Sequence, residues 1–193
     1  MRTKGYILIT ITLTMHTALI IPKVQADSKS SREYQVKAAF LYNFIKFVDW
    51  PKEKFNEEEE SITIGIIGKD PFGNAFEPIK NKKVKNRKVV IKRFDSYKGS
   101  KDSSEQIESI RQCHLLYICP SEKEKTREII NLIKDHSVLT VGEIKSFLKL
   151  GGIINFLMDD NKVQFEINKT AAERAKLQIR SKLLRLAKRV IPK

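Results

Sequence analysis

The sequence predicts a single α/β domain: a mostly parallel sheet of about six strands with helices on both faces and a C-terminal antiparallel hairpin. Four short apolar runs, rich in β-branched residues, are separated by helical patterns of about ten residues, which is typical of βαβ units. Two more apolar runs flank a polar turn near the C-terminus, which indicates a hairpin. The sequence has no internal repeat, linker or low-complexity segment that would divide the chain.

Residues 1–26 have the features of a cleaved export signal. A basic start precedes an uncharged apolar run over 6–21, and Val24-Gln25-Ala26 has the small-residue form of a cleavage site. The alternative is a membrane anchor, but the apolar run is shorter than the roughly 20 residues that span a bilayer comfortably. We therefore expect an exported protein whose domain occupies residues 27–193.

The domain is expected to begin with a helix over residues 33–49. Apolar side chains recur there at helical spacing, and Pro51 pushes the residue before it out of the α region. Such a stripe either packs on the core of the domain or docks a partner protein. For the second alternative, the candidate contact residues are Tyr34, Phe40 and Phe47.

Four parallel strands are expected next, each followed by a helix. The strands are rich in Ile, Val and Leu, and Ser121 and Glu124 have the spacing of a capping box at the start of the third helix. The expected strands are 62–67, 89–94, 113–119 and 138–141, and the helices that follow them are 74–80, 103–111, 122–135 and 143–150.

The C-terminal part is expected to form a hairpin and a closing helix. The arms 152–158 and 163–167 flank a turn that contains Asp160 and Asn161, residues that tolerate left-handed backbone. Asn168 or Thr170 then caps a basic amphipathic helix. Its apolar side is expected to pack on the domain, so contact with a membrane surface is a less favoured alternative.

The formal net charge of +14 limits the classes of partner. A strongly basic protein often binds nucleic acid, but an exported protein rarely meets any. Acidic lipid, acidic polysaccharide or an acidic partner protein therefore ranks higher. Since the lysines are spread along the whole chain, a basic but otherwise ordinary soluble surface is an equal alternative.

Cys113 and Cys119 are the two cysteines of the chain. Both lie in one expected strand, which places them roughly 20 Å apart. A disulfide needs Cα atoms within ~7 Å, so an intramolecular bond is not expected. Small buried core residues are the favoured interpretation, and both remain candidates for a redox role or an intermolecular disulfide.

The search for chemistry finds one weak candidate. Gly68 and Gly73 have the spacing of a phosphate loop, but Asn74 stands where such a loop has lysine. A helix beginning at Asn74 could still hold an anion with Lys69 nearby, so Gly68, Lys69, Gly73 and Asn74 form a candidate anion-binding turn. No nucleophile elbow or zinc-ligand spacing is present, and we expect neither an enzyme nor a cofactor or metal.

Seven stretches together resemble the YfiR-like periplasmic family, and they cover nearly the whole chain after the leader. The most specific are YQVKAAFLYNFIKFVDWP at 34–51 and GGIINF at 151–156. The others are GKDPFG at 68–73, CHLLYI at 113–118, VLTVG at 138–142, DNKVQFEIN at 160–168 and SKLLRLA at 181–187.

The resemblance implies a periplasmic α/β protein that is often a homodimer. Its best-known members bind the periplasmic sensor part of an inner-membrane diguanylate cyclase and hold it inactive, which lowers cyclic-di-GMP output and biofilm formation. The family often pairs a cysteine at the position of Cys113 with an earlier one, and this sequence has no earlier cysteine. A receptor for a small anionic ligand, or an accessory to another membrane sensor, is the alternative function.

Overall fold

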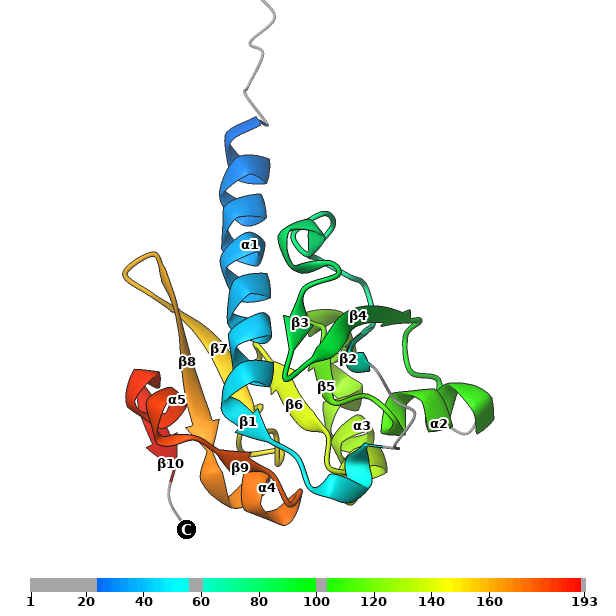
Figure 1. Cartoon of the computed structure of the whole chain (residues 1–193). Helices are drawn as coiled ribbons and strands as arrows, with labels where there is room; N and C mark the ends of the chain where they lie inside the picture. The colour runs from blue at the N-terminus through cyan, green and yellow to red at the C-terminus, as the bar shows by residue number, and fades with distance from the viewer. Residues whose placement is uncertain (1–23, 56–60, 100–103, 192–193) are drawn as a thin grey trace, which may run out of the picture.

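The computed structural model describes residues 24–55, 61–99 and 104–191, and it confirms the α/β fold class (Figure 1). The main sheet has the strand order β10-β8-β7-β6-β5-β2-β4-β3. Its centre is parallel, and the pairs β7–β8 and β3–β4 are antiparallel. The strands are β2 (Ser61–Ile67), β3 (Lys83–Val84), β4 (Arg87–Phe94), β5 (Leu115–Ile118), β6 (Leu139–Gly142), β7 (Ile154–Asp159), β8 (Lys162–Asn168) and β10 (Arg189–Ile191).

The six longer strands are those that the sequence predicts, and the two short edge strands β3 and β10 complete the sheet. Strand β5 is buried at every position, as expected of a central strand covered on both faces. The hairpin turn is confirmed, because Asp160 and Asn161 have φ values of 45° and 60°. Both residues belong to the types that enter left-handed backbone at low cost.

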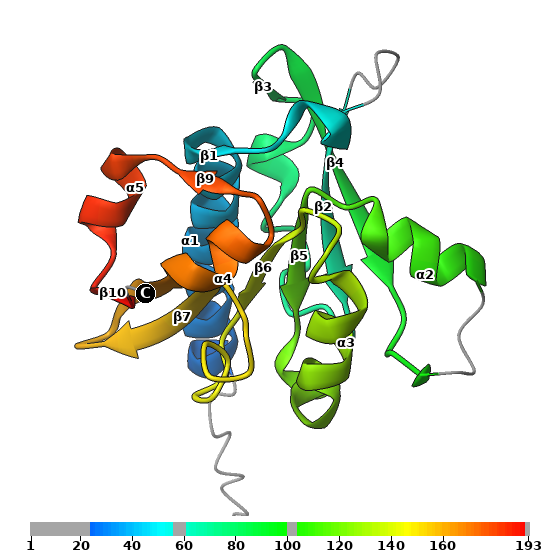
Figure 2. The same ribbon diagram turned by 90° about the horizontal axis from the view of Figure 1, so that it is seen from below.

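Helices cover both faces of the sheet (Figure 2). The long helix α1 (Val24–Phe47) packs on one face, where Leu41 and Phe44 share a core with Ile64 of β2. On the other face, α3 (Thr126–Ile133) contributes Ile129 to a second core, and α2 (Ser104–Arg111) lies beside it. The aromatic stripe of α1 is therefore mainly a core face, one of the two alternatives that the sequence leaves open.

The prediction of one closing helix after Asn168 is wrong, because that segment contains two short helices and two short strands. Helix α4 (Lys169–Arg174) is followed by β9 (Gln178–Ile179), and α5 (Ser181–Leu186) is followed by β10. Lys176 has a φ of 57°, which stops α4, and β9 then pairs with β1 (Val48–Asp49). No continuous basic amphipathic helix forms in this segment, although Asn168 caps α4 as expected by accepting a hydrogen bond from the Ala171 N–H at 2.9 Å.

Three other expected helices also differ, and the first of them, 74–80, forms turns and a short 3-10 helix (Glu77–Ile79) instead. Residues 143–150 form a series of turns, and the Phe147 ring packs so closely on Gly142 that a Cβ there would lie 2.5 Å from it. The expected helix 122–135 begins as a 3-10 helix (Pro120–Lys125) before α3. Ser121 does not cap it, because the helix begins at Pro120 and Ser121 lies inside it; the Ser121 hydroxyl accepts a hydrogen bond from the Lys69 N–H.

The expected leader lies outside the described residues up to position 23, and positions 24–26 belong to α1. Among the residues that the structure describes, no helix is both long enough and apolar enough to cross a bilayer.

Candidate functional site

The carboxyl ends of the parallel strands gather the polar loop residues that the sequence places there. The chain leaves β2 toward β4 on one side, and β5 lies on the other side of β2, so the strand order reverses between β2 and β5. Ligands of open α/β sheets bind at such a switch point. The loops meet there through two hydrogen bonds: the Lys69 N–H donates to Ser121 Oγ at 2.9 Å, and the Tyr97 N–H donates to Glu122 Oε2 at 3.1 Å.

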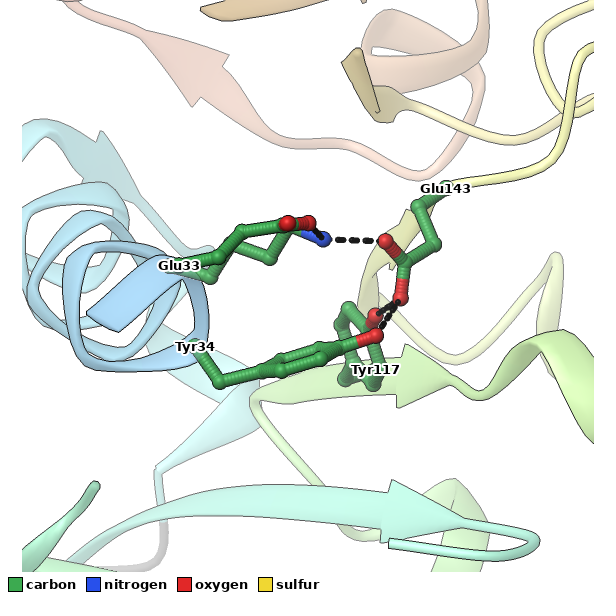
Figure 3. A network of polar contacts seen from close by, with 5 residues as sticks. Glu33, Tyr34, Tyr117 and Glu143 are labelled. Carbon is green, nitrogen blue, oxygen red and sulfur yellow. Dashed lines mark hydrogen bonds and ion pairs between the residues drawn. The ribbon is translucent and has the colours of Figure 1, made fainter. Parts of the chain in front are cut away.

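Five side chains form a connected polar group beside this edge, which we call the carboxyl-edge cluster (Figure 3). Lys37 Nζ donates to Glu33 Oε1 at 2.5 Å and also to Glu143 Oε2. The Tyr34 hydroxyl donates to Glu143 Oε1 at 2.8 Å, and the Tyr117 hydroxyl donates to the same oxygen. The cluster thus joins α1 to β5 and to the segment that follows β6.

Burial makes the cluster strongly interdependent. The side chain of Lys37 is 1% exposed, and its ammonium group also lies 4.4 Å from the ring centroid of Tyr34. Desolvation by burial, followed by the charge of Glu143, raises the pKa of Tyr34 and of Tyr117 well above the ordinary value. Both phenols are therefore neutral donors to Glu143 and are poorly suited to act as bases or nucleophiles.

An aromatic contact connects the cluster to the loop after β2. The ring of Phe72 lies 5.2 Å from that of Tyr34 and 4.8 Å from that of Tyr117, both in edge-to-face geometry. Such pairs stabilise beyond the area that they bury. The loop that contains the candidate anion-binding turn is thus anchored beside the cluster by a buried ring.

The candidate anion-binding turn does not form the site that the sequence suggests. Gly68 and Gly73 both have positive φ, but no α-helix begins at Asn74, and a 3-10 helix (Glu77–Ile79) lies beyond it. The N–H of Lys69 donates to Ser121, and Asp70 accepts the N–H of Phe72 at 2.7 Å. Arg93 pairs with the same Asp70 at 2.7 Å. The N–H groups of Gly68 and Lys69 are therefore used within the protein, and no helix N-terminus is present at Asn74 to hold an anion.

The three docking candidates lie on α1 but in different surroundings. Tyr34 belongs to the carboxyl-edge cluster, whereas Phe40 and Phe47 are partly buried against the core. Phe40 packs on Phe165 with ring centroids 5.5 Å apart. Among the side chains of α1 that the structure describes, the large apolar one that is exposed is Val36, which the sequence does not distinguish from its buried neighbours.

Both cysteines are free and fully buried, which favours the core interpretation over an intermolecular disulfide. Burial raises the pKa of the Cys113 thiol and of the Cys119 thiol to about 12. Because the thiolate is the reactive form, neither residue is suited to redox chemistry in the folded protein.

The sequence does not identify Lys37 and Tyr117 as members of a site. A signal for Lys37 exists, because it lies three residues after Tyr34 and four before Leu41, on the apolar side of the helix. A lysine in that stripe requires acidic partners.

Within the described residues, no group of three or more His, Cys, Asp or Glu side chains is arranged to hold a metal ion.

Several solved structures share the fold, and two of them illustrate it. A conserved domain protein from Vibrio cholerae is 14% identical with a TM-score of 0.51, and the ABC domain from Streptococcus pneumoniae, solved in complex with L-Trp, is 10% identical with a TM-score of 0.54. Each match covers 82% of this chain and 60% of the other, so the chain spans under two thirds of their length. At these identities the likeness concerns the fold alone.

No curated protein matches the chain. The family model that describes YfiR/HmsC-like proteins (DUF4154) matches residues 34–188, which include α1 from Tyr34, the whole sheet up to β8, and both sides of the carboxyl-edge cluster. The chain therefore belongs to the YfiR/HmsC-like family.

Proposed function

We propose that this protein is an exported, non-enzymatic regulator that binds the periplasmic sensor part of an inner-membrane diguanylate cyclase and holds the cyclase inactive. The observation that carries the proposal is the family membership, which extends over residues 34–188. The expected result of its activity is lower cyclic-di-GMP output.

The chemistry of the carboxyl-edge cluster supports contact rather than catalysis. Its two carboxylates, its ammonium group and its two phenols satisfy one another. A catalytic site needs a group whose charge or proton is available to a substrate. The cluster instead fixes α1 against the sheet, which gives a partner a rigid helix to recognise.

Regulation by contact requires different affinities for the two states of the cyclase. A ligand shifts a two-state equilibrium only by its differential affinity for the states. Moving the cyclase from almost fully active to almost fully inactive takes a difference of about 10⁴-fold. The contact surface must therefore distinguish two conformations of the sensor part and not simply bind it.

The test is to produce the full chain, with its leader, in cells that also produce a candidate membrane diguanylate cyclase. Cyclic-di-GMP should fall, and the cyclase should co-purify with this protein from detergent-solubilised membranes. A matched variant without residues 1–26 should leave cyclic-di-GMP unchanged, because it stays on the wrong side of the membrane. Unchanged cyclic-di-GMP with both intact proteins present, across the cyclases of the host genome, would contradict the proposal.

A further inference from the structure

A groove lies between the N-terminal half of α1 and the β7–β8 hairpin. The hairpin runs away from the helix toward its turn, so the two elements diverge (Figure 1). The groove has a volume of about 450 Å³. Its lining residues are Arg32, Glu33, Val36, Phe40, Met158, Asn161, Lys162 and Val163.

The floor and walls of the groove are apolar. Phe40 lies at the floor, where its ring centroid is 6.0 Å from that of Phe156. Val36 lies one turn before Phe40 on α1, and Met158 of β7 lines the same groove next to its cross-strand partner Val163. Val36 is 45% exposed and Met158 is 44% exposed, so two of the four large apolar side chains exposed in the described residues meet at this groove.

The rim of the groove is positively charged. Arg32 and Lys162 are exposed, and neither forms an ion pair with any acidic side chain that the structure describes. Glu33 also lines the groove, and its carboxylate pairs with Lys37 in the carboxyl-edge cluster rather than with Arg32 or Lys162. At the hairpin end, Asp159 pairs with Lys188 at 2.6 Å.

The combination of apolar walls and a cationic rim determines the chemistry of the occupant. An apolar side chain that enters between Val36 and Met158 loses contact with water, and acidic neighbours of that side chain meet Arg32 and Lys162. A second copy of this chain would bring the same two cations to the contact, and the formal net charge of the chain is +14. Like charges disfavour that arrangement.

We propose that this groove docks a segment of the regulated membrane protein in which a large apolar side chain is flanked by acidic residues. The inference rests on the proposed function for the identity of the partner, and it adds the place of contact and the chemistry of the segment. Val36, Met158, Arg32 and Lys162 are the contact residues.

The experiment uses the full chain together with the cyclase that it inhibits. Val36→Glu and Met158→Glu place a negative charge on an exposed wall, so binding of the solubilised cyclase should weaken by about tenfold or more. The matched control is Val90→Glu, because Val90 is 44% exposed and lies on β4, outside the groove. The control should bind and inhibit like the wild type. Thermal unfolding of all three variants shows whether they fold.

A second pair of variants tests the charge complementarity. Arg32→Glu combined with Lys162→Glu should weaken binding and remove much of its dependence on salt. Lys80→Glu combined with Lys123→Glu changes the net charge by the same amount at side chains that are 62% and 69% exposed, and it should have little effect. Equal losses in the two double variants would overturn the charge argument and indicate attraction by the whole chain.

The outcomes separate this inference from the proposed function. If the wild type inhibits the cyclase and the groove variants inhibit it equally well, the groove is not the docking site while the function stands. If the wild type fails to bind or inhibit, the proposed function itself fails. A dimer by light scattering that Val36→Glu dissociates, or vesicle binding by the wild type that Met158→Glu abolishes, would assign the groove to a second copy or to lipid and overturn the inference.

Discussion

Lys37 and Glu143 form an ion pair between residues that are 106 positions apart, and the pair connects α1 to the end of β6. The lysine side chain is 1% exposed and the glutamate side chain is 13% exposed. A charge so deeply buried is tolerated only when it is paired and hydrogen-bonded. Glu33, Tyr34 and Tyr117 supply the remaining hydrogen bonds, so the position of α1 depends on the whole cluster.

Removing one member of this pair should destabilise the protein strongly. Lys37→Met leaves Glu143 without its cation, and Glu143→Gln leaves Lys37 with Glu33 alone. Breaking a buried ion pair costs about 3–5 kcal/mol of the free energy of unfolding when it leaves a charge unpaired. Lys37→Met should therefore lose about that much, and Glu143→Gln should lose less because Glu33 still pairs with Lys37. Urea unfolding at pH 7 measures the loss.

The double variant Lys37→Met with Glu143→Gln should cost less than the sum of the single variants, because the two residues interact directly. The control is Lys80→Met. Lys80 pairs with Glu77, but the two side chains are 62% and 64% exposed, so this ion pair should contribute little to the free energy of unfolding. Strictly additive losses would show that the pair is not coupled.

The pair Asp49–Arg180 should stabilise the junction between α1 and the C-terminal segment modestly. Arg180 donates two hydrogen bonds of 2.8 Å to Asp49, and Lys85 donates one of 2.6 Å. The side chains of Asp49 and Arg180 are 36% and 53% exposed, so solvent screens the pair and Asp49→Asn should reduce the free energy of unfolding only slightly.

The pH dependence of that loss has a defined sign. Hydrogen bonding to Arg180, then to Lys85, lowers the pKa of Asp49 from 3.8 to about 2. The contribution of the pair is therefore complete above pH 3.8 and disappears as the pH falls through 2. The difference in unfolding free energy between the wild type and Asp49→Asn should be constant from pH 5 to 7 and shrink below pH 4.

The strands were predictable because their signal is local. The run from Ile62 to Ile67, for example, combines β-branched residues with flanking turns, and it forms strand β2 together with Ser61. The hairpin turn at Asp160 and Asn161 and the cap at Asn168 also depend on the conformational preferences of single residues.

The closing segment and the cluster were not predictable in the same way, because both depend on contacts between residues distant in sequence. Residues 172–187 have a helical pattern, yet the pairing of Ile179 with Val48 places a strand inside it. Similarly, Glu143 becomes part of a site only when the fold brings Lys37 to it. Tertiary contacts routinely override a local helical preference, which a pattern read from the sequence alone does not reveal.

The two thiols should be unreactive in the folded protein. Burial raises the pKa of both Cys113 and Cys119 to about 12, and neither side chain is exposed. An aromatic disulfide reagent at pH 8 should label two thiols in guanidinium chloride and almost none in its absence. Rapid labelling of the folded protein, or a disulfide-linked dimer on non-reducing electrophoresis, would restore these cysteines as redox candidates.

Acid should destabilise the protein through His114. This side chain is fully buried between the rings of Phe55 and Trp50, its Nδ1 accepts the N–H of Thr63 at 3.2 Å, and its Nε2 has no partner among the described residues. Desolvation by burial, followed by the charges of Lys54 and Arg87, lowers the pKa of His114 from 6.5 to about 3. The imidazole is therefore neutral in the folded protein at physiological pH.

Protonation of the unfolded chain sets the direction of the effect. Above pH 6.5, His114 is neutral in both states and adds no pH dependence. Below pH 6.5, the unfolded chain binds a proton that the folded protein does not bind, so the free energy of unfolding falls by about 1.4 kcal/mol per pH unit until the folded pKa near 3 is reached. His114→Asn keeps an acceptor for the Thr63 N–H and cannot titrate, so it should have a flatter urea-unfolding profile between pH 6 and 4 than the wild type. His136→Asn, at the exposed histidine, should keep most of the wild-type slope, and equal slopes in the wild type and His114→Asn would show that His114 is not the group that titrates.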